Sequence, residues 1–176
     1  PCNPSGSVYT FEETKAIAEV LLKNDNIITI SDEIYELINF TPKHASLAGI
    51  PGMMDRVVTV NGVSKGFAMT GWRLGYIGAP KWIAAACNKI QGQITSAPCS
   101  IAQAAAAEAV DADPSIADEM LNAFLRRRDQ MLNDLEGIPG IKLNKPMGAF
   151  YLFPDISGLF GKSHNGKTLN NSDDVA

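Results

Sequence analysis

The sequence predicts an α/β fold built around a mainly parallel sheet. Short β-branched runs alternate along the chain with helical patterns, which is typical of this fold class. Two of these runs, Ile27–Ile30 and Val57–Val60, resemble strands that are covered on both faces of a parallel sheet. Hydrophobic residues make up 45% of the 176 positions, which is enough for a packed core and excludes a disordered chain.

The first half of the chain predicts one helix and three strands. Thr10 and Glu13 have the spacing of a capping box, in which each side chain bonds the backbone N–H of the other residue. Apolar residues at helical spacing continue this helix to about Lys23. The strands are expected at Ile27–Ile30, at Val57–Val60 and, with a weaker pattern, at Tyr76–Ala79.

The second half predicts three helices and then two strands. The helices are expected at Pro80–Ile94, with Pro80 in the first position, at Ser100–Val110 and at Pro114–Glu136. The strands are expected at Ile141–Leu143 and Ala149–Phe153. The closing residues, Ser172–Ala176, have the pattern of a first helical turn.

Composition excludes several classes of function. With 15 Lys and Arg against 19 Asp and Glu, the net charge is −4, and no basic run exceeds Arg126–Arg128, which argues against a nucleic-acid surface. No apolar stretch approaches the roughly 18 residues of a membrane span. The three cysteines and two histidines lack the spacing of a metal site, so no metal is expected. Few cysteines, odd in number, favour a reducing, cytoplasmic location.

Asp32 and Tyr35 are the first candidate functional residues. Asp32 comes just after a predicted buried strand, separated from it by Ser31, and ligands of α/β sheets bind at this carboxyl edge. Tyr35 adds a phenol three residues later. The alternative interpretation is a helix-capping aspartate beside a packed tyrosine.

The connection between residues 61 and 75 is the second candidate. It is long, rich in glycine and without an apolar stripe, which is more typical of a binding loop than of a spacer. It holds Lys65, which would otherwise be a solvated loop lysine. It also holds Arg73, whose guanidinium fork suits an oxyanion such as phosphate.

At these positions the sequence resembles the class I/II aminotransferases of fold type I, which use pyridoxal phosphate. Within that family it is most similar to the aspartate aminotransferases of bacteria and plastids. Four segments carry the resemblance in family order: Asn3–Gly6, Ser31–Tyr35, Val63–Gly75 and Lys145–Tyr151. The third segment is close to diagnostic, and together the four span about residues 1–155.

The resemblance implies a role for each candidate residue. Lys65 would form the Schiff base with pyridoxal phosphate and move the substrate's α-proton. Asp32 would hold the protonated ring nitrogen, and Tyr35 with Asn3 would hydrogen-bond the phenolic oxygen.

Three further positions complete the implied set. Arg73 and Ser64 would bind the phosphate. Phe150 would lie at the mouth of the substrate pocket, where Asn3 would also contact the substrate.

Two features of the sequence depart from the family pattern. Gly62 stands where many relatives carry a hydroxyl, so the phosphate would lose one donor. The arginine that would clamp the substrate's α-carboxylate is absent, since no Arg follows Arg128.

The chain is therefore expected to be a fragment, truncated at both ends. It opens at Pro1 without a Met and closes at Ala176 just inside a helix. Residues 1–118 would belong to the large cofactor-binding domain, and residues 119–176 would begin a small α/β domain.

The resemblance implies an aminotransferase of amino-acid metabolism. It would be a homodimer that exchanges an amino group between an L-amino acid, aspartate or glutamate, and a 2-oxo acid. The alternatives are another fold-type I enzyme, such as a C–S lyase or an aromatic or prephenate aminotransferase, or an inactive fragment. The piece alone is expected to be inactive.

Overall fold

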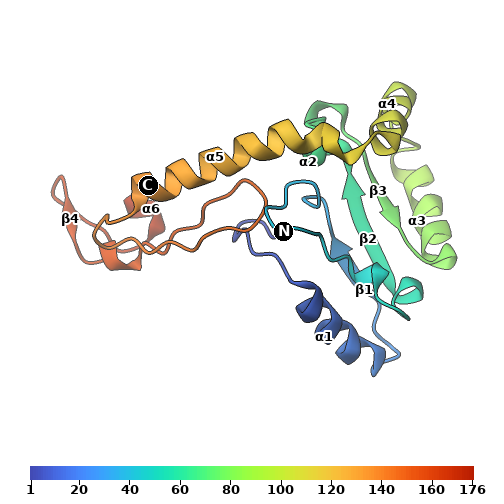
Figure 1. The fold of residues 1–176 in the computed structure, drawn as a ribbon, viewed down its shortest axis with the longest axis horizontal. Coiled ribbons are helices and arrows are strands. Elements are labelled where there is room, and N and C mark those ends of the chain that lie inside the picture. Colours follow the sequence, from blue (N-terminus) through green and yellow to red (C-terminus); the bar gives the residue numbers. More distant parts are fainter.

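A computed structural model describes the whole chain, residues 1–176, and confirms the α/β class. A three-stranded sheet stands at one end, and a long helix leads from it to the C-terminal segment (Figure 1). None of the helices is both long and apolar enough to cross a bilayer.

The sheet has the order β1-β2-β3, with β1 at Thr29–Asp32, β2 at Val57–Gly62 and β3 at Gly75–Gly78. β1 and β2 are parallel, with Thr29 opposite Val57, whereas β2 and β3 are antiparallel, with Val60 opposite Ile77. Because β3 runs back along β2, the connection between them needs no crossover helix. It forms only the short helix α2 (Val63–Gly66) and the 3₁₀ turn Thr70–Trp72.

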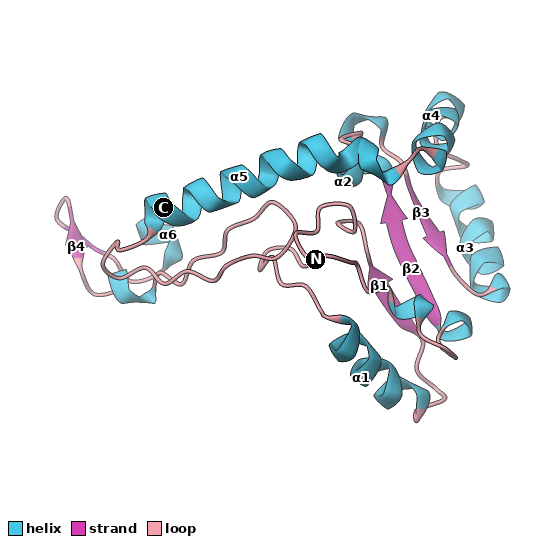
Figure 2. Ribbon diagram, in the orientation of Figure 1, coloured by secondary structure: helices cyan, strands magenta, loops and turns pink.

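The predicted helices of the first 136 residues all form. The Thr10–Glu13 capping box is confirmed at the start of α1 (Phe11–Leu22). The others are α3 (Lys81–Ile94), α4 (Ser100–Asp111) and α5 (Asp118–Leu135), the last preceded by a 3₁₀ turn at Pro114–Ala117. Pro80 is the N-cap of α3 and not its first residue, which is a correction of one position. α1 lies beside β1, whereas α3 and α4 lie toward β3, at the other edge of the sheet (Figure 2).

Two small cores hold these elements together. The first joins Ala18 of α1 to Val57 of β2 through the segment between them, which contributes Leu47, Ile50 and Met53. The second lies below α5, where Tyr35, Ile38 and Ala149 are buried. The second core fixes the segment after β1 against residues near position 149, and so brings distant parts of the sequence together.

The strands predicted at Ile141–Leu143 and Ala149–Phe153 do not form, which corrects the prediction. A single bridge joins Lys142 of the first segment to Asp155, which lies two residues beyond the second. The reason is that Met147 and Gly148 donate to the carbonyl of Gly6, and Ala149 donates to that of Ile38. These backbone groups therefore pair with the N-terminal segment and with the segment after β1.

The C-terminal segment contains a hairpin that was not predicted. β4 (Ser163–His164) and β5 (Lys167–Thr168) are antiparallel, and the terminal helix α6 (Ser172–Val175) follows them. Asn165 and Gly166 form the turn with φ of +48° and +78°. An Asn-Gly pair favours this turn type, so a local signal was present.

Some predicted burial is absent from the structure. Ile30 of β1 is 72% exposed, so this strand is not covered on both faces. α3 has no buried residue, and its Ile94 is 74% exposed. No element of the described chain lies over these side chains.

Candidate functional site

The candidate site is a hollow at the carboxyl end of β1, between this strand and the N-terminal segment. Asn3, Asp32 and Tyr35 line it, and its volume is about 560 Å³. The N-terminal wall is tied to the chain near position 147, because Gly6 accepts hydrogen bonds from the N–H groups of Met147 and Gly148 at 2.8 and 3.1 Å. Three of the predicted site residues therefore face one space.

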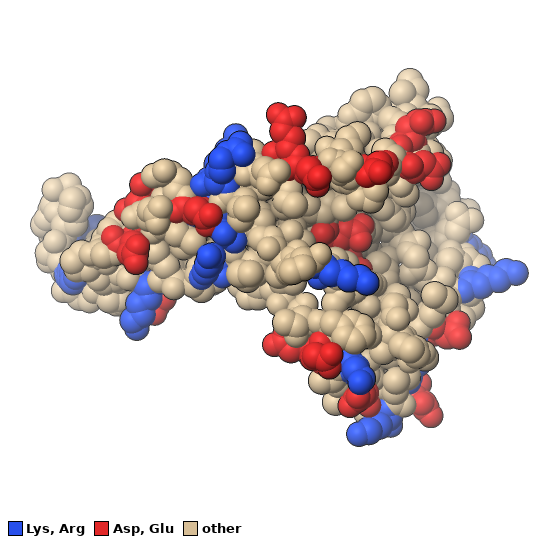
Figure 3. Space-filling view, viewed as in Figure 1, with Lys and Arg blue, Asp and Glu red and all other residues tan.

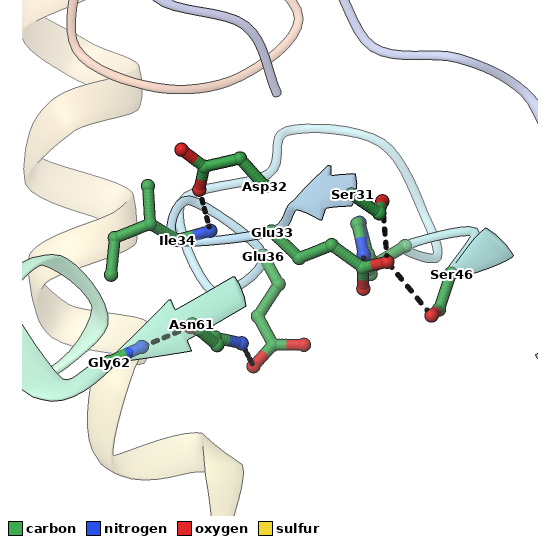
Figure 4. Close-up of polar contacts among 9 residues, drawn as sticks. Ser31, Asp32, Glu33, Ile34, Glu36, Ser46, Asn61 and Gly62 are labelled. Atoms are coloured by element: carbon green, nitrogen blue, oxygen red, sulfur yellow. Dashed lines mark hydrogen bonds and ion pairs between the residues drawn. The ribbon is translucent and has the colours of Figure 1, made fainter. Parts of the chain in front are cut away.

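Asp32 both caps the local chain and offers a free carboxylate oxygen. Its Oδ1 accepts a hydrogen bond from the N–H of Ile34 at 3.1 Å, the contact drawn in Figure 4. The side chain is exposed, and no residue of the chain bonds its second oxygen. The capping interpretation and the functional one are thus compatible, since each uses a different oxygen.

Tyr35 belongs to a hydrogen-bonded group of three side chains. Its hydroxyl lies 2.6 Å from the hydroxyl of Tyr151, and Asn3 Nδ2 donates to Tyr151 at 3.2 Å. Tyr35 is only 5% exposed. Burial raises the pKa of Tyr35 well above that of a free phenol, so it stays protonated at neutral pH.

Lys65 lies beside this group. Its Nζ is 5.9 Å from the centroid of the Tyr35 ring and 5.4 Å from that of Phe150. It makes no ion pair with any carboxylate of the chain, and its side chain is half-buried. An amine that faces two aromatic rings and has no counter-ion is available for chemistry.

Glycine allows the backbone around Lys65 to pack this closely. A Cβ on Gly66 would lie 2.8 Å from Leu37 Cδ1, and a Cβ on Gly62 would lie 2.9 Å from Gly75 Cα. A side chain at either position would push the Lys65 turn away from the segment after β1 or from β3.

Arg73 and Ser64 are not brought into this hollow. The Arg73 guanidinium donates to the carbonyl of Thr70 at 2.8 Å and lines a separate hollow with Trp72 and Ile101. Ser64 is half-buried in α2 next to Lys65. Phe150 does join the site, since its ring centroid lies 5.5 Å from that of Tyr35 in an edge-to-face contact.

A buried carboxylate network next to Asp32 was missed by the sequence analysis. Glu33 points away from Asp32 and accepts hydrogen bonds from Ser31 (3.0 Å) and Ser46 (2.9 Å), as Figure 4 shows. It accepts a third from His44 (2.8 Å). Burial favours the neutral acid, but these three bonds outweigh it and lower the pKa of Glu33. A glutamate at an inward-facing position of a strand end was the available signal.

Glu33, Glu36 and His44 also lie close enough to suggest a metal site, with ligand atoms within 4.8 Å of one another. Glu36 is bonded by Asn61 Nδ2 at 2.6 Å. Hydrogen bonds therefore account for this cluster, which holds the loop that follows β1 in place.

On the face shown in Figure 3, acidic and basic side chains are interspersed over the surface.

Comparisons with known proteins show what the chain is similar to. The family model described as aminotransferase class I and II matches residues 1–172. A bifunctional aspartate aminotransferase and glutamate/aspartate-prephenate aminotransferase of Petunia hybrida is 47% identical over 99% of the chain and 38% of its own length. A probable aspartate/prephenate aminotransferase of Rickettsia bellii is 47% identical over 99% of the chain and 44% of its length.

A solved structure extends this likeness to the fold. The crystal structure of the aspartate aminotransferase from Rhizobium meliloti superposes with a TM-score of 0.94 and is 39% identical. The alignment covers 99% of the chain but 44% of that protein. The chain thus spans less than half the length of the relatives it matches.

Proposed function

Since the chain belongs to the class I and II aminotransferase family, we propose that the full-length protein transfers an amino group from an L-amino acid to a 2-oxo acid. The observation that carries this proposal is the position of Lys65. Its amine has no counter-ion and lies within 6 Å of the ring of Tyr35, which lines the same hollow as Asp32. Pyridoxal phosphate, when bound, would supply an electron sink for negative charge at the substrate's α-carbon.

The residues of the hollow fit this cofactor chemically. The free carboxylate oxygen of Asp32 suits a protonated ring nitrogen, because an opposite charge favours the charged form. The hydroxyl of Tyr35 and the amide of Asn3 suit the phenolic oxygen, to which both can donate. We assign these three residues to the cofactor.

Lys65 would carry the cofactor and act as the base. Its amine makes no ion pair and lies beside the rings of Tyr35 and Phe150, so no carboxylate of the chain blocks it from a ligand. Lys65 Nζ would accept the proton from the substrate's α-carbon and pass it to the C4′ carbon of the cofactor, and the reverse half-reaction would move it back. Phe150, whose ring lies 5.4 Å from this amine, would shape the entrance for the substrate.

Arg73 and Ser64 are proposed as phosphate ligands on their position in the sequence. Both lie on the connection that carries Lys65, and the planar guanidinium of Arg73 is suited to a phosphate dianion. The bond from Arg73 to Thr70 would have to be exchanged or shared when the phosphate binds.

The proposal extends to the organisation of the protein. We propose that residues 1–118 belong to the cofactor-binding domain and that residues 119–176 begin a smaller one, because α5 begins at Asp118 and leads away from the sheet (Figure 1). A homodimer and a cytoplasmic location complete the proposal. The three free cysteines favour such a reducing compartment.

Aspartate or glutamate is the proposed amino donor. Prephenate is a second candidate as amino acceptor, because relatives that are 47% identical to this chain are named for it. Transfer assays with aspartate and either 2-oxoglutarate or prephenate would separate the two acceptors.

Replacing Lys65 with Ala in the full-length protein tests the function. We expect the variant to lose both the absorbance of the bound cofactor and the transamination of aspartate. Lys81→Ala, which removes an exposed lysine from the start of α3, is the matched control and should keep both. If absorbance and transamination both survive in Lys65→Ala, the assignment is wrong.

A further inference from the structure

We propose that Tyr151 is a positioning residue of the active site, which orients the hydroxyl of Tyr35 and the amide of Asn3 toward the cofactor. The inference rests on the proposed function. Its observation is that one phenol oxygen contacts both groups, at 2.6 Å from the Tyr35 hydroxyl and 3.2 Å from Asn3 Nδ2. These partners are 116 and 148 residues away along the chain, so the contacts depend on the fold.

The hydrogen bonds that the Tyr151 hydroxyl can make explain how it would orient Tyr35. A phenol can donate one hydrogen bond and accept two. The Tyr151 oxygen accepts from Asn3, so its own hydrogen is available to the Tyr35 oxygen. If Tyr35 donated to Tyr151, it would have no hydrogen left for a ligand in the hollow. When Tyr151 is the donor, the hydrogen of Tyr35 is free to point into the hollow.

The surrounding structure fixes this arrangement. The ring of Tyr35 makes an edge-to-face contact with that of Tyr151, with centroids 5.8 Å apart. Ala149 donates to the carbonyl of Ile38 at 2.7 Å and so ties the backbone before Tyr151 to the backbone after Tyr35. The two phenols are therefore held in register by the backbone as well as by their own bond.

The same oxygen also holds Asn3 in place. Asn3 is exposed, and its segment is tied to residues 147 and 148 through the carbonyl of Gly6. Without the Tyr151 hydroxyl, the Asn3 amide would lose the hydrogen bond that it donates there. Tyr151 thus acts on both proposed donors to the phenolic oxygen, without needing to touch the substrate.

A spectroscopic titration of the full-length protein tests this role. The pH at which the absorbance of bound pyridoxal phosphate changes is measured for wild type and for Tyr151→Phe. Weaker donation to the phenolic oxygen destabilises its anion, so we expect an upward shift of roughly half a pH unit. Tyr35→Phe should shift the midpoint further in the same direction. Adding Tyr151→Phe to Tyr35→Phe should then have a smaller effect than in wild type.

Two further variants separate positioning from a structural effect. Tyr76→Phe removes a hydroxyl from a tyrosine of β3 that makes no side-chain hydrogen bond, and it should leave the midpoint unchanged. A monofluorinated tyrosine at position 151 keeps the ring and the phenol but donates more strongly. It should strengthen the donation by Tyr35 through cooperativity and shift the midpoint downward.

The outcomes distinguish this inference from the function on which it rests. If wild-type protein binds no pyridoxal phosphate, the proposed function fails. If wild type binds it and neither Tyr151→Phe nor the fluorinated residue moves the midpoint, Tyr151 has no positioning role, whereas the proposed function stands. Should Tyr151→Phe fail to fold, the direction of the shift in the fluorinated protein decides alone, and no shift or an upward one overturns the inference.

Discussion

Glu33→Gln is expected to lower the free energy of unfolding at neutral pH, although the two side chains have nearly the same shape. The carboxylate accepts from Ser31 and Ser46 on one oxygen and from His44 on the other. The glutamine oxygen can still accept from both serines, and its amide can donate to His44 if the imidazole changes tautomer. What is lost is the charge of the acceptor, about 1 kcal/mol for each of three bonds at most, so we expect a loss of about 2 kcal/mol.

The effect of Glu33→Gln should also depend on pH. Burial works to raise the pKa of Glu33, but the bonds from His44, Ser46 and Ser31 outweigh it, and the pKa lies below its ordinary value of 4.5. A lowered pKa in the folded state stabilises the protein above the unfolded-state pKa, and this contribution is lost as the pH falls through the folded-state pKa. The difference between wild type and Glu33→Gln should therefore shrink below about pH 4.5.

Urea unfolding of the full-length protein, followed by tryptophan fluorescence from neutral to acid pH, measures this difference. Glu19→Gln is the matched control, since Glu19 is exposed on α1 and accepts no hydrogen bond from another side chain. The reasoning is refuted if Glu33→Gln costs no more than Glu19→Gln. A cost that stays constant into the acid range would refute the pH argument.

The other predictions concern packing. Gly6→Ala should lower the free energy of unfolding by about 2 kcal/mol or more, because the φ of Gly6 is +68° and the new Cβ would lie 2.2 Å from Pro146 Cβ. Gly71→Ala, where a Cβ would meet nothing within 4 Å, is its control; equal shifts in thermal midpoint would contradict the prediction. Ile38→Ala should cost about 2–5 kcal/mol, since Ile38 is fully buried. Its control is Ile90→Ala on exposed α3, which should lower the free energy of unfolding by less than about 0.5 kcal/mol in urea. A larger loss for Ile90→Ala than for Ile38→Ala would contradict the prediction.

Elements with strong local signals could be predicted from the sequence. The capping box fixed the start of α1, and runs of β-branched residues located β1 and β2 to within two residues. The strand expected at Ala149–Phe153 failed for a non-local reason. The N–H of Ala149 pairs with Ile38, and those of Met147 and Gly148 just before it pair with Gly6, which no pattern within the segment could indicate.

The candidate site was predictable in part. The resemblance and the position at the carboxyl end of β1 singled out Asp32 and Tyr35, and the structure places both on one hollow. Tyr151 was missed because its contacts reach across more than a hundred residues, and a tyrosine inside a predicted strand has no distinguishing pattern. The direction of the Arg73 side chain likewise depends on a local bond to Thr70 that sequence alone does not specify.

The most direct test of the proposed function is to find where the cofactor is attached. The full-length protein is incubated with pyridoxal phosphate, reduced with borohydride, digested and mapped by mass spectrometry. The account predicts a stable adduct on Lys65, the amine that lies beside the rings of Tyr35 and Phe150. An adduct on another lysine, with Lys65 unmodified, would contradict it.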